Sequence, residues 1–235
     1  MNFTPPMQMP NQFLAALPDD DCNGLLAHCV AVELAFTDVL YRSGERIAYI
    51  YFPTGSFISL VMAIEGHANL EVGLVGNEGV LGITTALGVD TAPFEALVQG
   101  AGSAWRISVP TFLHELQRSP SLTLQLHRYI YVSLSQLAQT AACTRFHLVE
   151  ARLARWLLMT QDRAHSAQFH ITHVFLAYML GVRRVGITKA ANALLKKNLI
   201  SYTRGAVTVL DREGLERAAC SCYASDNACY QLIMG

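Results

Sequence analysis

The stretch from Ser121 to Cys143 constrains the fold most, because it contains no glycine or proline and directly follows Pro120. Nothing in it would break or turn a helix, so it predicts one long helix. Before it, short apolar runs alternate with glycine-bearing turns, and after it apolar residues recur at helical spacing. We therefore expect a β part, a connecting helix and a second, mostly helical part.

The part before the long helix is expected to be an antiparallel barrel or sandwich. A short helix at 11–17 is predicted first, with Asn11 as its N-cap. Regular spacing of short strands and glycine-bearing turns, as seen from Val30 to Ile107, is typical of all-β domains. The clearest predicted strands are 48–52, 57–62, 70–75 and 94–98.

The long helix carries two apolar stripes. One begins at Leu122, and the other follows a four-three spacing through Ile130, Leu134, Leu137 and Ala141. A helix with two apolar stripes must bury one in its own domain and the other against another surface. We predict that the second of these stripes is a dimer interface. A helix wholly buried within its own domain is the alternative.

Charge is segregated along the chain. Residues 1–144 hold five basic and twelve acidic residues, a balance of −7, whereas residues 145–235 hold twelve basic and six acidic, a balance of +6. The net charge of −1 therefore conceals an acidic part joined to a basic part. A basic surplus of this kind indicates a polyanion such as nucleic acid as partner, with ordinary solvated helix faces as the alternative.

Composition raises the question of a membrane protein, since 52% of residues are hydrophobic, 15% are charged and the mean hydropathy is +0.29. The uncharged stretch 47–64 contains Pro53 and Gly55 and is a poor spanning helix. No Lys or Arg precedes Arg42, so the positive region of a signal peptide is lacking. We expect a cytoplasmic protein without membrane association.

The basic part has the order of a winged helix-turn-helix. A helix at 148–163 precedes two helical segments separated by Gly181, and a hairpin at 199–202 and 206–210 precedes a last helix at 212–220. Gly181 permits the left-handed turn that ends the first of the two segments.

The segment after Gly181 is predicted to be a recognition helix. Such a helix presents cations and polar groups at its N-terminal end to base edges and phosphates. We predict DNA contacts by Arg183, Arg184, Thr188 and Lys189, and Thr172 suits the N-cap of the preceding helix.

Several residues of the basic part resemble the Crp/Fnr family of bacterial transcription regulators. They are Gly181, Arg184, Lys189, the segment 198–201 before the wing, and the tail in which 210–216 precedes Cys220-Ser221-Cys222-Tyr223. The resemblance implies an α+β fold with an antiparallel β-roll sensor at 1–120, similar to a cyclic-nucleotide-binding domain. It also implies a connecting dimerisation helix at 121–144 and a winged helix-turn-helix at 145–235.

The resemblance also implies how such a protein works. It would be a homodimer that binds a palindromic operator in double-stranded DNA, with RNA polymerase as a further partner. Arg184 and Lys189 would contact bases or adjacent phosphate, and Thr172 and Arg204 would contact the backbone. Many members carry Glu after the recognition Arg, whereas this chain has Val185, which favours apolar contact with a thymine methyl.

A cyclic nucleotide is not expected as effector. Family members hold its phosphate with an Arg and its ribose with a Glu, but Ile83 stands at the position expected for the Glu. From Ile47 to Trp105 the chain has neither Lys nor Arg, so a buried phosphate would lack a strong cation. No cofactor is predicted, and the effector stays unknown.

A regulator that responds to redox state, a metal or haem is the alternative. Cys220, Cys222 and Cys229 form a C-x-C-x6-C set, and Cys22, Cys29, His28, His67, His114, His170 and His173 are further candidates, but no metal site is assigned. A DNA-binding protein without an effector and a β-roll enzyme are two further possibilities. No phosphate loop, G-x-S-x-G or zinc spacing is present, so no enzyme is predicted.

Overall fold

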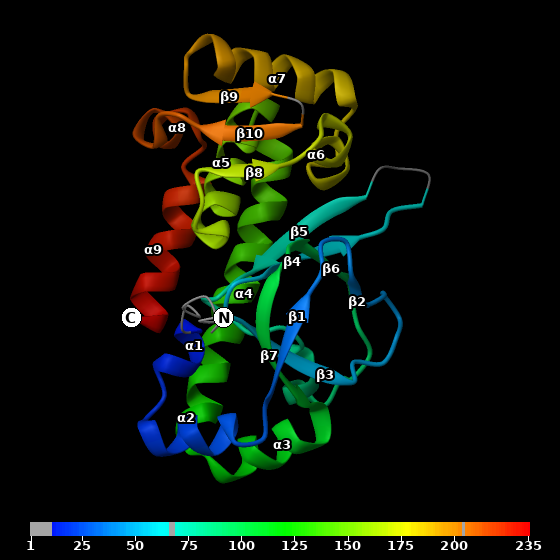
Figure 1. Cartoon of the computed structure of the whole chain (residues 1–235), viewed down its shortest axis with the longest axis vertical. Helices are drawn as coiled ribbons and strands as arrows, with labels where there is room; N and C mark the ends of the chain where they lie inside the picture. Colours follow the sequence, from blue (N-terminus) through cyan, green and yellow to red (C-terminus); the bar gives the residue numbers. More distant parts are fainter. Residues whose placement is uncertain (1–10, 66–68, 204) are drawn as a thin grey trace, which may run out of the picture. The chain divides into compact units, whose positions relative to one another are not determined.

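The computed structural model describes residues 11–65, 69–203 and 205–235 (Figure 1). The elements up to the long helix are α1 (Gln12–Ala15), α2 (Asp19–Leu26), β1 (Val30–Leu34), β2 (Val39–Tyr41), β3 (Tyr49–Pro53), β4 (Phe57–Met62), β5 (Leu70–Val75), the 3-10 helix η1 (Ile83–Leu87), β6 (Glu95–Gly100), β7 (Gly102–Ser108) and α3 (Val109–Arg118). The remaining elements are α4 (Pro120–Phe146), α5 (Val149–Ala164), β8 (Gln168–His170), α6 (His173–Met179), α7 (Arg184–Lys196), β9 (Ile200–Thr203), β10 (Ala206–Val209), α8 (Arg212–Ala218) and α9 (Cys222–Met234). The predicted α+β class with antiparallel sheets is confirmed.

The chain divides into two compact units. Unit 1 comprises 1–60 and 74–130, and unit 2 comprises 61–73 and 131–235. The division falls within α4, so one continuous helix contributes to both units. The predicted domain boundaries after residues 120 and 144 separate segments by the role expected of each, not by their packing. They stay a prediction.

The strands form antiparallel sheets, as the sequence predicts. β7 is the middle strand of the sheet β1-β7-β3, with Val32 opposite Ala104 and Phe52 opposite Trp105. A second sheet has the order β2-β6-β4-β5. Strands β1, β2 and β7 lie within the region predicted as β, but they are not among the strands predicted most clearly from the sequence.

An aromatic cluster fills the core of unit 1. The rings of Phe13 and Phe52 lie 6.0 Å apart, and Phe112 and Tyr129 complete the cluster at similar separations. Phe13 comes from α1, which begins at the predicted N-cap, because the Asn11 side chain accepts a hydrogen bond from the Leu14 amide. This cap and the burial of Phe13 explain why so short a helix forms here.

In unit 2, α5 packs against α7 and α8. One face of α5 is buried, since Leu153, Trp156, Leu157 and Thr160 are each at most 6% exposed. The wing is a three-stranded sheet of order β8-β10-β9, in which β8 adds a strand to the predicted hairpin. Figure 1 shows α7 running alongside β9.

The end of the chain differs from the prediction. The last predicted helix, 212–220, ends at Ala218, because Ala219 has extended backbone angles and turns the chain. A further helix, α9, then begins at Cys222 and buries Tyr223, Asp226 and Met234. None of the helices in the described ranges is both long and apolar enough to cross a membrane.

Candidate DNA-binding interface

The helix-turn-helix consists of α6, the turn at Gly181 and α7. Thr172 is the N-cap of α6, and its hydroxyl accepts a hydrogen bond from the Phe175 amide at 3.1 Å. Gly181 has φ +62, the left-handed conformation predicted for it, so the turn requires a residue that tolerates positive φ. Leu176, Met179 and Leu180 are buried and form the core face of α6.

α7 buries an apolar face and presents basic residues at its N-terminal end. Ile187, Ala190, Ala191 and Leu194 are buried, whereas Leu195 is only partly buried. The exposed side chains toward the N-terminal end are those of Arg183, Arg184, Val185 and Lys189. Arg183 occupies the N-cap position, and its side chain makes no capping hydrogen bond.

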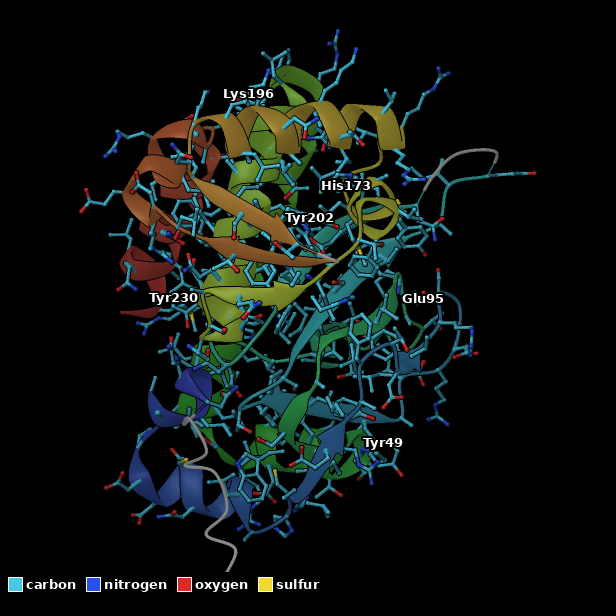
Figure 2. The ribbon with its side chains drawn as sticks, turned by 45° about the horizontal axis from the view of Figure 1, so that its top comes forward. Tyr49, Glu95, His173, Lys196, Tyr202 and Tyr230 are labelled. Carbon is cyan, nitrogen blue, oxygen red and sulfur yellow. The ribbon has the colours of Figure 1, made fainter. Side chains whose placement is uncertain are left out.

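Thr188 joins the two helices of the motif. Its hydroxyl donates to the Arg184 carbonyl oxygen at 3.1 Å and lies 3.2 Å from Nδ1 of His173. His173 in turn packs on Tyr202 of the wing, with 4.7 Å between ring centroids. Figure 2 shows this pair close together, with Lys196 toward the other end of α7. The hydroxyl of Thr188 is thus engaged within the motif, and its contact with DNA stays a prediction.

The surroundings of His173 favour its neutral form. Burial lowers the pKa of its imidazole, and the positive charge of Arg184 lowers that pKa further. Its Nε2 is buried and has no hydrogen-bond partner among the described residues. A second N–H on the ring would therefore be unsatisfied, which agrees with the direction of the shift.

Other cations of unit 2 are neutralised within the protein. The pairs are Lys197–Glu150 at 2.6 Å, Arg212–Asp162 at 2.7 Å and Arg155–Asp226 at 2.6 Å between nitrogen and oxygen. The excess of basic residues in this part of the chain therefore does not make its surface evenly positive. On α7 it is presented by Arg184, Lys189 and Lys196, together with Arg183 at the cap.

The wing is formed by β9 and β10. Val207 pairs with Tyr202 across the hairpin, and Gly205 has φ +85 at its turn. Arg204, which is predicted to contact the DNA backbone, lies outside the described residues.

Several solved structures have the same fold. FixK2 from Bradyrhizobium japonicum aligns with a TM-score of 0.69 at 11% identity, over 82% of this chain and 98% of its own. The c-di-GMP responsive global regulator CLP of Xanthomonas campestris gives 0.68 at 16%, over 82% and 99%. A CRP/FNR-family transcriptional regulator from Thermus thermophilus gives 0.66 at 20%, over 81% and 98%. At these identities the likeness shows the fold.

A search among curated proteins found no significant match. Residues 151–218, from α5 to the end of α8, match the sequence profile of the Crp-like helix-turn-helix domain. This part of the chain is a Crp-like helix-turn-helix domain. The matched range contains both helices of the motif and the wing, and so it covers every residue for which a DNA contact is predicted.

The stripe predicted to form a dimer interface is accessible on α4. Leu134 is 61% exposed and its neighbour Tyr131 is 57% exposed. Ala141 is exposed, and Ile130 and Leu137 are partly exposed. The stripe that begins at Leu122 is buried instead, which separates the two faces as the spacing predicts.

Four metal-ligating side chains also come together in unit 2. Cys143 and His147 come from the end of α4, and Cys220 and Cys222 come from the junction of α8 and α9. Their ligand atoms all lie within 4.8 Å of one another. No metal site was assigned from the sequence. Of the C-x-C-x6-C set, Cys220 and Cys222 belong to this group, whereas Cys229 does not.

The thiols of Cys143 and Cys220 form a hydrogen bond with each other. Sγ of Cys143 lies 3.5 Å from Sγ of Cys220. A hydrogen bond from the Cys220 thiol lowers the pKa of Cys143, and His147 and Arg155 lower it further against the effect of burial. The pKa of Cys220 is raised, first by its hydrogen bond to Cys143 and then by burial. One thiolate of the pair is thus favoured.

The remaining candidate ligands are dispersed. His28 lies 3.7 Å from Glu115, His114 is exposed on α3, and His67 lies outside the described residues. Cys29 donates to the Leu25 carbonyl oxygen within its own helical turn. The spacing of Cys143 and His147, four residues apart on a helix, is the signal that would have pointed to the cluster.

Proposed function

We propose that this Crp/Fnr-type regulator acts as a homodimer on a palindromic site in double-stranded DNA. The exposed cations at the N-terminal end of α7 carry this proposal, since a recognition helix needs them there and the other cations named above are paired internally. Arg184 and Lys189 would contact bases or adjacent phosphate, and Thr172, Arg183 and Arg204 would contact the backbone. Thr188 would position the start of α7.

The exposed stripe on α4 supports the homodimer. An exposed Leu134 beside Tyr131 is an apolar surface that a second copy would cover. Two copies related by a twofold axis would place their recognition helices about 34 Å apart, one turn of the duplex. RNA polymerase is the further partner expected of such a regulator. The protein would act in the cytoplasm, by binding rather than by catalysis.

Sedimentation velocity of the full chain tests the dimer. Leu134→Glu should give monomers where the wild type is dimeric, because the side chain is exposed in the single chain and its change leaves the core intact. Leu87→Glu is the matched control, since Leu87 is 60% exposed on η1, away from the stripe. Dimers that resist Leu134→Glu as well as Leu87→Glu would refute this interface.

Footprinting tests the site on DNA. We expect a short protected region with twofold symmetry and half-sites one duplex turn apart. Uniform coverage without a preferred site would instead indicate a DNA-binding protein with an architectural role.

The effector of this regulator is proposed not to be a cyclic nucleotide. Arg46 is paired with Asp90 at 2.7 Å, and Arg106 lies over the ring of Tyr49 at 4.4 Å. Between these two residues the sequence has no Lys or Arg to neutralise a phosphate. Isothermal titration with cyclic AMP and cyclic GMP is the test, and micromolar binding of either would overturn the proposal.

A further inference from the structure

The cysteine–histidine cluster has the composition of a closed metal site. Three thiols and one imidazole surround one point, and Cys143, Cys220 and Cys222 are at most 8% exposed. All six cysteines of the chain are free, so none of the three is committed to a disulfide. A Cys3His set is a recurrent ligand set of structural zinc.

The spacing of the cluster fits a tetrahedral ion. Bond lengths of about 2.3 Å to sulfur and about 2.0 Å to nitrogen give tetrahedral edges of about 3.8 Å between two sulfurs and about 3.5 Å between sulfur and nitrogen. The distance between Sγ of Cys143 and Sγ of Cys220 is 3.5 Å. Sγ of Cys222 lies 3.4 Å from Nδ1 of His147. Two opposite edges of the tetrahedron are therefore already formed.

The backbone presents these ligands in pairs. Cys143 and His147 are one helical turn apart, and the His147 amide still donates to the Cys143 carbonyl oxygen at 3.1 Å. Cys220 and Cys222 flank Ser221, the N-cap residue of α9. Both pairs are thus fixed by regular backbone at the ends of helices.

The surroundings of the cluster favour thiolates. Nε2 of Gln139 donates to Sγ of Cys222 at 2.9 Å, the kind of outer hydrogen bond that orients a metal ligand. The positive charges of Arg152 and Arg155 act on Cys143. Three thiolates with a divalent ion carry one net negative charge, which these guanidinium groups offset.

We propose that Cys143, His147, Cys220 and Cys222 bind one Zn²⁺ and so fasten the end of α4 to the start of α9. A disulfide is the rival use of Cys143 and Cys220, but 3.5 Å is well beyond the sulfur–sulfur bond of about 2.05 Å. The site does not depend on the proposed DNA binding, and its role is structural.

The metal content of the purified full chain tests this proposal. Protein produced with zinc and iron both supplied should contain about one zinc per chain by mass spectrometry. Zinc should fall to background in Cys143→Ser and in His147→Asn. The matched control is Cys229→Ser, which removes a cysteine of α9 outside the cluster and should leave the zinc content unchanged.

A second measurement covers the case in which a ligand variant does not fold. Co²⁺ added to the metal-depleted wild type should give the intense visible absorption of a tetrahedral thiolate site, and Zn²⁺ should abolish it. The proposal would be overturned if the wild-type protein contained no metal or contained iron with acid-labile sulfide. A Cys143–Cys220 disulfide in place of zinc would also overturn it. Equal zinc in Cys143→Ser and Cys229→Ser would overturn it too.

Discussion

Removal of the Asp226 carboxylate should destabilise unit 2 strongly. Asp226 lies on α9 and accepts a hydrogen bond from the Arg155 guanidinium at 2.6 Å, and both side chains are only 8% exposed. Arg155 also donates to Oγ1 of Thr140 at 3.2 Å, but its Nε has no hydrogen-bond partner among the described residues. In Asp226→Ala, a buried positive charge would lose its counterion.

The expected cost is about 3–5 kcal/mol, the usual penalty for leaving one partner of a buried ion pair uncompensated. For a chain of this size, this corresponds to a decrease in Tm of about 6–20 °C. Glu216→Ala is the matched control. It breaks the ion pair with Arg212, whose side chains are 41% and 43% exposed, and should cost at most about 1 kcal/mol.

Urea denaturation followed by fluorescence measures both costs. The chain has two tryptophans, so a Trp105→Phe background leaves Trp156 of α5 as the reporter of unit 2. The double variant Arg155→Met, Asp226→Leu should recover much of the lost stability, because it removes both charges. A cost of Asp226→Ala no larger than that of Glu216→Ala would refute the reasoning.

Three further outcomes are expected. Arg184→Ala should weaken operator binding by about 1–3 kcal/mol and relax specificity at one base step, as measured by mobility shifts. Arg217→Ala on α8 is the control. Equal losses of affinity for operator and for random DNA would contradict a contact between Arg184 and a base. Because burial and Arg184 lower the pKa of His173, its contribution to stability should be complete above the ordinary value of 6.5 and be lost as pH falls through the lower folded value. Urea midpoints across this range should depend less on pH in His173→Gln, and an unchanged profile would count against the shift. Gly100→Ala should lower the free energy of unfolding by about 1–3 kcal/mol, because the added Cβ would lie 1.9 Å from the buried ring of Phe57. Thermal unfolding measures this change. A Tm equal to that of the wild type would show that the ring can move aside.

Local patterns predicted the DNA-binding motif well. The recognition helix after Gly181, the N-cap at Thr172 and the glycine of the turn depend on neighbouring residues, and the structure has each of these features. Arg183 and Arg184 are exposed because they lie at the N-terminal end of α7, before its first buried residue, Ile187. Their contacts with DNA stay predictions.

The cysteine–histidine cluster could not be predicted from such local patterns, because its two pairs of ligands are far apart in the chain. Cys143 and Cys220 are separated by 77 positions, and only the packing of α9 brings them together. The spacing in the tail suggested Cys229 as a ligand instead. Seven residues of helix separate Cys229 from Cys222, a rise of about 10.5 Å, which is too far for one ion.

The exposed side chain of Val185 has a consequence for ionic strength. It stands at the second residue of α7 and is 60% exposed, beside the cations of the same helix end. Phosphate contacts weaken as salt rises because they release counterions, whereas an apolar contact with a thymine methyl releases none. As salt is raised, total affinity should therefore fall while the preference for thymine over uracil at that base persists.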